Sequence, residues 1–182
     1  NTYQMYRHDR LGFFIKSYEH ARQNGYKLGA KFVRGAYMEK ERKRAAKMGY
    51  PSPISPSKLE VDRDYDEALR YCAEHIDHIS CCSASHNENS NRLLAELLEE
   101  KGIEKQHPHV LFCQLFGMSD HITFNLAKAG CAVSKFLPYG PISDVIPYLM
   151  RRARENTSVR GQTSRELKLI NDEIKRRRGE KV

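Results

Sequence analysis

The sequence has 182 residues, of which 40% are hydrophobic and 30% charged, a balance typical of one globular domain with a sizeable core. Its apolar runs are all shorter than a membrane span, and its five irregularly spaced cysteines argue against a disulfide framework and for a reducing compartment. The net charge of +8 suits nucleic acid, anionic lipid or a phosphate-bearing cofactor, and equally a set of solvated helix faces. The sequence opens on Asn1 in what looks like the inside of a strand, so we expect a fragment of a longer protein.

Short β-rich runs alternate with helical periodicity along the sequence. Residues 1–6 predict a strand, and apolar positions over 11–21 predict a helix that stops at Asn24 and Gly25. The later strands are predicted at 30–33, 79–84, 110–115 and 132–137. The later helices are predicted at 38–48, about 62–78, 122–129, about 143–156 and about 163–178, and one more helix carries residues 93–98 and ends before Gly102. A proline- and serine-rich loop is predicted at 50–57. The last helix opens with a capping box, Thr163-x-x-Glu166, and places Leu167, Ile170 and Ile174 on one side.

Five strands that are nearly all followed by helices, without a hairpin signal, predict parallel pairing through helical crossovers. A complete eight-stranded barrel has typically ~250 residues. We therefore predict an α/β fold in which residues 1–182 form roughly the last five βα units of a single (βα)8 barrel domain. A doubly wound open sheet has the same alternation, and periodicity alone does not choose between the two folds.

Ligands of parallel α/β domains bind at the C-terminal ends of the strands. The strand at 30–33 leads into Lys-Phe-Val-Arg-Gly-Ala-Tyr, residues 31–37. Alternation places Lys31 and Val33 on one face and Phe32 and Arg34 on the other. A lysine on the inner face of a barrel is costly unless it serves a charged ligand. The next strands end in Ala-Ser-His-Asn (84–87), Leu-Phe-Gly-Met (115–118) and Leu-Pro-Tyr-Gly-Pro (137–141), which ordinary turns also explain.

The helix predicted at 143–156 carries an unusual polar stripe. Tyr148, Arg151, Arg152 and Glu155 stand at i, i+3, i+4 and i+7 and share one face. Two adjacent guanidinium groups suit a carboxylate, because each can donate a bidentate pair of hydrogen bonds, and Glu155 can orient one of them. An exposed, salt-bridged helix face has the same spacing.

A second group of residues has the side-chain types of a zinc site. The set Cys72, His75, His78, Cys81 and Cys82 runs from a predicted helix into the following strand. Four ligands must converge on zinc, whereas this geometry disperses them. We therefore interpret the cysteines as core residues and the histidines as surface groups, and predict no metal.

In this order, the segments resemble the proline dehydrogenase family, from residue 1 to about residue 156. The two strings at 31–37 and 148–156 carry the resemblance, and the other strand ends support it in sequence order. The resemblance implies FAD bound in the mouth of a barrel, and no GxGxxG motif is present. It implies oxidation of L-proline to 1-pyrroline-5-carboxylate by hydride transfer to flavin N5, with the electrons passed to a quinone at a membrane surface.

The resemblance also assigns roles to residues of this sequence. It places Lys31 beside flavin N5, where a cation would stabilise the anionic reduced flavin, and it gives the substrate carboxylate to Arg151 and Arg152. The implied catalytic residues are Lys31, Tyr37, Arg151 and Arg152. The implied substrate-binding residues are Tyr37, Leu115, Phe136, Tyr148, Arg151 and Arg152. The implied cofactor-binding residues are Lys31, Val33, Arg34, Gly35, Ala36, Ala84, His86, Asn87, Gln114, Arg152 and Glu155.

The sequence departs from the family pattern at three points. Phe136 stands where the family usually has a tyrosine that lines the pocket, which bears on the choice between proline and hydroxyproline. Cys113 occupies the place of a strand-end glutamine, with Gln114 next to it. The earlier strands, which hold the family's catalytic lysine and an acidic partner, are absent, so we expect the isolated chain to be inactive and to self-associate through open sheet edges.

Three other interpretations remain at this point. Hydroxyproline dehydrogenase of the same fold is the nearest, a basic nucleic-acid-binding module is of a different class, and a structural fragment without function is the third. Basic runs without interleaved aromatic residues disfavour nucleic acid. The resemblance favours the bacterial cytoplasm, peripheral to the inner membrane, with the matrix side of the mitochondrial inner membrane as the alternative.

Overall fold

The computed structural model describes residues 1–158 and 162–179. The chain divides into two compact units, Asn1–Phe136 and Leu137–Val182. Each unit is described by itself below.

The first unit is built on one parallel sheet. In the described residues this sheet has five strands in the order β1-β2-β3-β4-β5, namely β1 (Thr2–Gln4), β2 (Leu28–Val33), β3 (Ile79–Ala84), β4 (Val110–Leu115) and β5 (Val133–Phe136). Every neighbouring pair is parallel, as the alternation of strands and helices predicts. Each strand therefore adds to the sheet next to its predecessor, without the reversal of order that marks a doubly wound fold.

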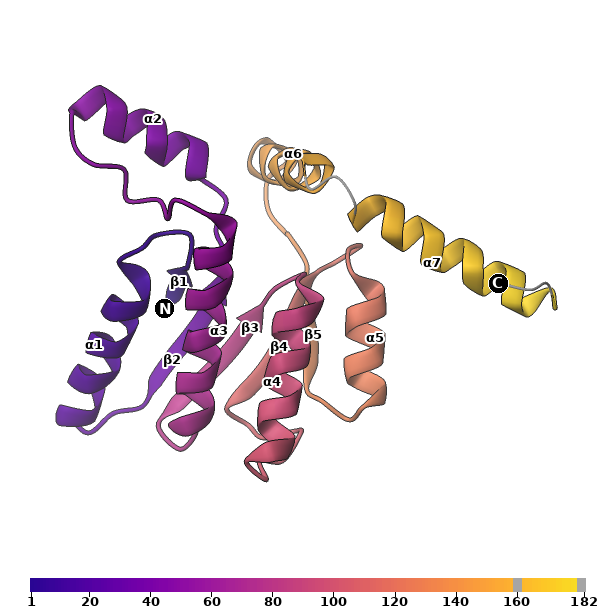
Figure 1. Ribbon diagram of the computed structural model, residues 1–182, viewed down its shortest axis with the longest axis horizontal. Helices are drawn as coiled ribbons and strands as arrows, with labels where there is room; N and C mark the ends of the chain where they lie inside the picture. Colours follow the sequence, from indigo (N-terminus) through magenta and orange to yellow (C-terminus); the bar gives the residue numbers. More distant parts are fainter. Residues whose placement is uncertain (159–161, 180–182) are drawn as a thin grey trace. The chain divides into compact units, whose positions relative to one another are not determined.

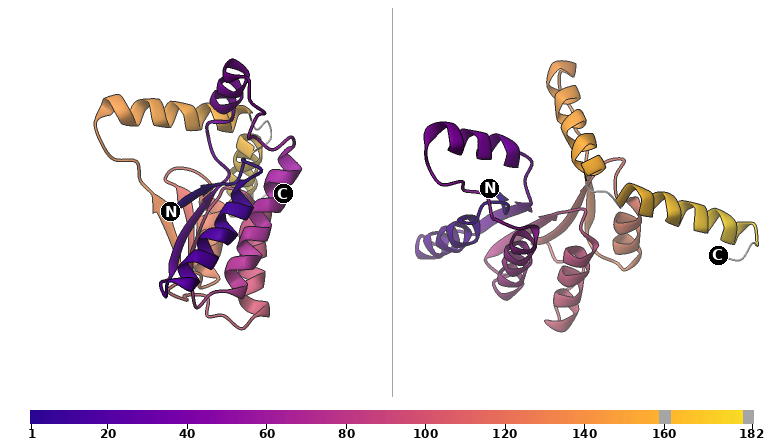
Figure 2. Two further views of the ribbon diagram at one scale, coloured as in Figure 1. Left: turned by 90° about the vertical axis from the view of Figure 1, so that its left-hand side faces the viewer. Right: turned by 45° about the horizontal axis from the view of Figure 1, so that its top comes forward.

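Four helices cover one face of this sheet. They are α1 (Arg10–Gln23), α3 (Lys58–Glu74), α4 (Glu88–Glu100) and α5 (Asp120–Lys128). Figure 1 shows α3 and α4 in front of the strands with α1 and α5 at either side, and the right-hand view of Figure 2 shows all four fanning out along the same side of the sheet. A doubly wound sheet carries helices on both faces. One-sided cover with strands in chain order is the arrangement of a segment of a (βα)8 barrel, which confirms the predicted fold class.

The hydrophobic core lies between the sheet and these helices. Tyr3 of β1, Phe14 of α1 and Phe32 of β2 form its aromatic centre, with the rings of Phe14 and Phe32 packed edge to face at 4.9 Å. Phe32 is fully buried, and burial of a phenylalanine side chain stabilises the fold by about 2 kcal/mol. Alternate residues of each strand point to the core, so the intervening residues form the opposite face, which we call the open face.

Several predicted boundaries differ from the observed ones, and for two of them the structure shows the reason. Strand β2 begins at Leu28 rather than at 30, because the backbone of Gly29, a residue of low β propensity, is held by pairing with Ser80 of β3. Helix α3 occupies Lys58–Glu74 rather than about 62–78. Ser57 supplies the start signal, since its Oγ accepts the Glu60 amide at 3.2 Å as an N-cap.

The remaining element of the first unit is α2 (Met38–Met48), which follows β2 and lies away from the four covering helices (Figure 1). Of its residues only Ala45 is buried.

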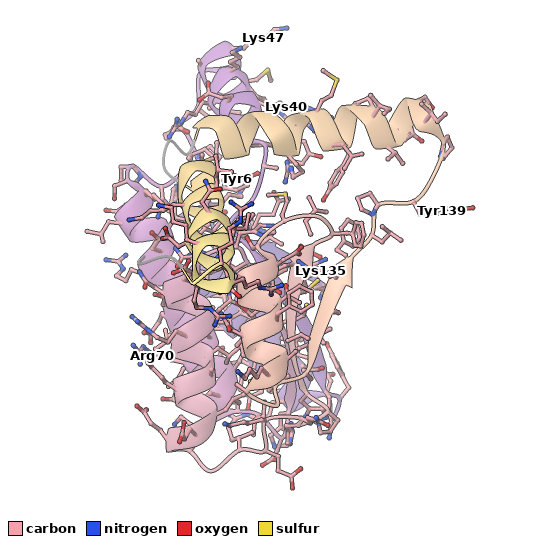
Figure 3. The ribbon with its side chains drawn as sticks, turned by 90° about the vertical axis from the view of Figure 1, so that its right-hand side faces the viewer. Tyr6, Lys40, Lys47, Arg70, Lys135 and Tyr139 are labelled. Atoms are coloured by element: carbon pink, nitrogen blue, oxygen red, sulfur yellow. The ribbon has the colours of Figure 1, made fainter. Side chains whose placement is uncertain are left out.

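The second unit consists of α6 (Ile142–Ser158) and α7 (Gln162–Arg177). Pro147 lies in the second turn of α6, where it removes one backbone donor. Tyr139 precedes α6, is 99% exposed and points away from the ribbon in Figure 3. The predicted capping box at Thr163 and Glu166 lies outside the residues whose side chains are described.

Candidate cofactor and substrate site at the strand ends

Lys31 lies half-buried on the open face of the sheet, while Phe32 next to it is buried under the helices, as strand alternation predicts. The Lys31 side chain crosses the face toward β5, and its Nζ lies 5.0 Å from the centroid of the Phe136 ring. A cation over an aromatic face is attracted by the ring quadrupole. The open face therefore presents a positive charge that is positioned by an aromatic residue three strands away.

Several other predicted site residues share this face with Lys31. Val33 and Ala84 are half-buried at the ends of β2 and β3. Leu115 and Phe136 are direct cross-strand neighbours in β4 and β5; Leu115 is buried, whereas Phe136 is 43% exposed. The open face thus ends in an apolar wall beside a cation, which is the chemistry needed by a flat, partly charged ligand.

Gly35 ends β2 in a conformation that requires glycine. Its φ is +104°, and a Cβ added there would lie 1.7 Å from Cδ1 of Tyr6. The Tyr6 amide donates to the Arg34 carbonyl at 2.8 Å, so the buried tyrosine is fixed against this strand end. Burial, followed by the charge of Glu41, raises the pKa of the Tyr6 hydroxyl and keeps it neutral. Tyr6 was not among the predicted site residues, although its place next to a strand was a weak signal.

Arg34 points to the helix side of the sheet and joins four elements. Its Nε donates to Asp62 Oδ1 at 2.6 Å, and its two terminal nitrogens donate to Ser85 Oγ at 2.8 Å and Ser90 Oγ at 2.9 Å. The guanidinium also lies 4.3 Å from the centroid of the Tyr65 ring. Burial favours the neutral form of Asp62, but Lys58 and Arg34 outweigh it and lower the pKa of this carboxyl. Arg34 therefore holds the end of β2 against α3, α4 and the end of β3.

The end of β3 is shaped by hydrogen bonds to the start of α4. Asn87 caps this helix, because its Oδ1 accepts the Ser90 amide at 3.2 Å. His86 Nδ1 lies 2.9 Å from Ser119 Oγ, across the gap to the end of β4. The positive end of the α4 dipole thus faces the same edge of the sheet as His86.

Gln114 is separated from the predicted cofactor residues of the open face. It is 1% exposed on the helix side, where its Nε2 donates to the Ser85 carbonyl at 3.3 Å and its Oε1 accepts from Thr123 Oγ1 at 2.9 Å. The neighbouring Cys113 is the residue that faces Lys31's side of the sheet, opposite Ser134. This arrangement favours a structural role for Gln114, and its contact with a cofactor stays a prediction.

The loop after β4 contains residues that the sequence did not point to. Ser119 has φ +52°, a left-handed conformation that is uncommon outside glycine, and it lies at the start of α5. Lys135 of β5 donates to the Met118 carbonyl at 2.6 Å and pairs with Asp120 at 2.7 Å (Figure 3). A strained residue held by its neighbours at a strand end is typical of a functional edge.

Tyr37 and Ala36 follow Gly35 and lead into α2. Tyr37 is 40% exposed at the position preceding the helix, and Ala36 is half-buried. Both therefore lie at the C-terminal end of β2, the edge to which Gly35 and His86 also belong.

In the second unit, α6 brings part of its predicted stripe together. The guanidinium carbon of Arg152 lies 5.3 Å from the centroid of the Tyr148 ring, one turn away on the helix. Arg151 and Arg152 are both half-buried. The side chain of Glu155 lies outside the described residues. Two cations and a phenol on one helix face can bind a carboxylate.

The cysteine- and histidine-rich segment spreads over two faces of the sheet. Cys72 of α3 and Cys81 of β3 are in the core, while Cys82 lies on the open face. The ring of His75 stacks on Tyr18 at 4.7 Å. Within residues 1–158 and 162–179, no three His, Cys, Asp or Glu side chains are grouped as metal ligands.

Comparison with known proteins shows the family. The model of the family described as "Proline dehydrogenase" matches residues 1–165. The chain belongs to the proline dehydrogenase family.

Related proteins agree along nearly the whole chain. Human "Proline dehydrogenase 1, mitochondrial" is 43% identical, and the match covers 97% of this chain and 30% of the human protein. "Hydroxyproline dehydrogenase" of Xenopus laevis is 40% identical, and the match covers 97% of this chain and 39% of that protein. The crystal structure of proline utilization A from Bdellovibrio bacteriovorus, inactivated by N-propargylglycine, matches with a TM-score of 0.81 and 29% identity over 87% of this chain and 16% of that chain. The chain thus spans about a third of the length of these curated relatives.

Proposed function

We propose that the protein to which this proline dehydrogenase segment belongs oxidises L-proline to 1-pyrroline-5-carboxylate. The observation that supports this most is the placement of Lys31 on the open face of a barrel segment, next to the wall of Leu115 and Phe136. The arginine pair of α6 adds a carboxylate-binding group. Positioning and charge are what a protein contributes to such a reaction.

The residues of the strand ends fit FAD as the cofactor. Lys31 supplies a cation to the open face, and His86 with the capped start of α4 supplies donors and a positive dipole at the edge of the sheet. This set suits a ligand that carries both a flat ring and a diphosphate. FAD, when bound, supplies the acceptor for the hydride that leaves the carbon next to the proline nitrogen. We assign the ring side to Lys31, Val33, Gly35 and Ala36, and the ribityl and diphosphate side to Ala84, His86 and Asn87.

In this proposal the family resemblance assigns the substrate carboxylate to Arg151 and Arg152, and it gives substrate-binding roles to Tyr37, Leu115 and Tyr148. Two guanidinium groups orient a carboxylate by bidentate hydrogen bonds. The Tyr148 ring lies 5.3 Å from the guanidinium carbon of Arg152, within the range of a cation–π attraction. The catalytic lysine and acidic partner that the family resemblance implies lie outside these residues, so the 182-residue chain alone is expected to be inactive.

The test uses the full-length protein and the variants Lys31→Met and Lys27→Met. The wild-type protein should be yellow and lose its flavin absorption when proline is added. Lys31→Met should retain flavin but lose about 100-fold in the rate of bleaching, the size of effect of one preorganised charge in a reaction site. Lys27, exposed just before β2, is the matched control and should have no effect. A colourless folded protein, or one whose colour proline does not change, would reject the proposal.

Hydroxyproline is the second candidate substrate, and Phe136 is the observation that favours it. This ring is 43% exposed on the open face, and its position lacks the hydroxyl that the family resemblance leads one to expect. A missing hydroxyl leaves room and changes the polarity of the pocket wall. Phe136→Tyr should therefore raise kcat/KM for proline relative to 4-hydroxyproline, and an unchanged ratio would remove Phe136 from substrate selection.

We further propose a quinone as the electron acceptor, reached at a membrane surface. We propose the inner membrane of a bacterium or of a mitochondrion as its location, and this is supported by matches both to relatives named mitochondrial and to proline utilization A of Bdellovibrio bacteriovorus. No helix of the described part of the chain has the length and apolar character of a membrane span. We expect the full-length protein to reduce a soluble quinone analogue when proline is present and not when proline is absent.

A further inference from the structure

Helix α2 carries a row of basic side chains along its outer face. Four residues stand at i, i+3, i+4 and i+7 and therefore share one side of the helix, namely Lys40, Lys43, Arg44 and Lys47. All four are exposed, whereas the buried Ala45 marks the opposite side of α2. We call these four residues the basic stripe. In Figure 3, Lys47 points away from the ribbon of the first unit.

The two acidic residues of α2 do not neutralise the basic stripe. Glu41 is turned toward the residues that follow β1, where its Oε2 lies 3.8 Å from Nη1 of Arg7. Glu39 flanks the stripe, and its Oε1 lies 3.5 Å from Nη1 of Arg42. Both carboxylates are thus paired with arginines outside the stripe, which keeps its positive charges directed outward.

Apolar side chains lie at the end of the basic stripe. Met48 stands one turn after Arg44 and is 66% exposed, and Tyr50 just beyond the helix is 40% exposed. Cations next to exposed apolar groups on a surface helix are typical of a segment that lies in the headgroup region of a membrane. The cations meet the phosphates there, and the apolar groups enter the boundary of the acyl chains. Nucleic acid offers the same phosphates but no apolar phase for Met48.

The position of α2 gives this surface a direction. The helix follows β2, and Figure 1 shows it beyond the C-terminal ends of the strands. The proposed cofactor residues of the strand ends lie at the same edge of the sheet. Contact of this edge with a membrane therefore brings the strand ends toward molecules that are dissolved in the lipid.

We propose that the basic stripe and Met48 form a docking surface for the anionic lipid headgroups of a membrane. The inference rests on the proposed function, because it supplies the contact through which a quinone dissolved in the lipid is reached. Attraction to an anionic bilayer strengthens binding by about fivefold for each lysine or arginine near the surface, and salt screens it. Four such residues with one apolar anchor give a reversible contact.

The test measures co-sedimentation of the full-length protein with vesicles of phosphatidylcholine alone and of phosphatidylcholine with an equal part of phosphatidylglycerol. The wild-type protein should bind the anionic vesicles far more tightly than the neutral ones, and less as salt is raised. Lys43→Gln combined with Lys47→Gln should weaken this binding by about 30-fold, since two attracted charges are removed. The matched control combines Lys101→Gln with Lys128→Gln, which removes the same charge where α4 and α5 end, at the opposite edge of the sheet. This control should change the binding by less than about twofold, because both lysines point away from the docked edge.

A third variant separates a membrane from other polyanions. Met48→Gln should weaken binding to the anionic vesicles by about fivefold, because an apolar side chain no longer enters the acyl boundary. Equal binding to the two kinds of vesicle, or an equal loss in the stripe variant and its control, would overturn the inference. Binding to duplex DNA as tight as to the anionic vesicles would overturn it as well and would assign the stripe to nucleic acid.

Bleaching of the flavin by proline, measured on the same samples, separates this inference from the proposed function. The stripe variants should bleach at the wild-type rate, since none of their residues belongs to the proposed site. A wild-type protein that is bleached by proline but does not bind anionic vesicles would overturn the docking surface alone. A protein that binds these vesicles through the stripe but is not bleached would support the docking surface and reject the proposed activity.

Discussion

Gly35→Ala is the substitution whose effect the structure determines most closely. The new methyl group would lie 1.7 Å from Cδ1 and 1.9 Å from Cε1 of Tyr6, and the backbone would remain at φ +104°. Forcing a side chain into a packed site costs about 1–3 kcal/mol. A non-glycine residue in this region of φ adds a further ~1–3 kcal/mol. We therefore expect a loss of about 3 kcal/mol in the free energy of unfolding, a large part of the 5–15 kcal/mol that holds a typical domain together.

Gly29→Ala is the matched control, because Gly29 lies in the same strand with no atom within 4 Å of the added Cβ and no positive φ. Thermal unfolding of the full-length protein, followed by circular dichroism, should show a Tm decrease of roughly 6–12 °C for Gly35→Ala and little change for Gly29→Ala. Tyr6→Ala in the Gly35→Ala background should remove the steric part of the loss, so the double mutant should be more stable than additivity predicts. Equal Tm values for the two glycine variants, or strict additivity with Tyr6→Ala, would refute the proposed contact.

Three further predictions concern the first unit. Arg34→Met should lower the free energy of unfolding by about 2 kcal/mol, since two serine hydroxyls lose their charged donor and Asp62 keeps only Lys58. Urea unfolding measures this loss. The control Arg63→Met, whose side chain is 72% exposed, should cost less than about 0.5 kcal/mol. Because the pKa of Asp62 is lowered in the folded state, its carboxylate stabilises the fold above about pH 4 and this contribution is lost as the pH falls through the folded value. The decrease in Tm between pH 5 and pH 3 should thus be smaller in Asp62→Asn than in the wild type, and an identical decrease would contradict this assignment. The isolated 182-residue chain should self-associate, because β1 and β5 each pair on one side only in the described sheet; a monodisperse monomer in sedimentation velocity at micromolar concentration would speak against it.

Much of the fold follows from local patterns. Strands β3 and β4 occupy the predicted residues, because each is a short apolar run between clear turn signals. The start of α3 was missed, since Ser57 stands at the end of a loop rich in proline and serine and its capping role depends on the backbone geometry that follows. Boundaries of this kind are decided by single hydrogen bonds that periodicity does not report.

Part of the candidate site also follows from a local pattern. Alternation within one strand correctly separated Lys31 from Phe32 and Arg34, because it needs no information beyond the strand itself. The sequence could not show that Gln114 faces the helices while Cys113 faces Lys31, since that choice depends on the register of β4 with β3 and β5.

The sequence by itself determined the alternation of strands and helices, the parallel pairing that this alternation requires, and the two motif strings that carry the family resemblance. These are local properties, set by side-chain periodicity and by the turn residues between elements. Only the tertiary structure decided that the helices cover one face, that Tyr6 closes over Gly35, and that Cys113 lies on the same face of the sheet as Lys31. Each of these contacts joins residues far apart in the chain, and their geometry exists only after neighbouring strands have paired in one register.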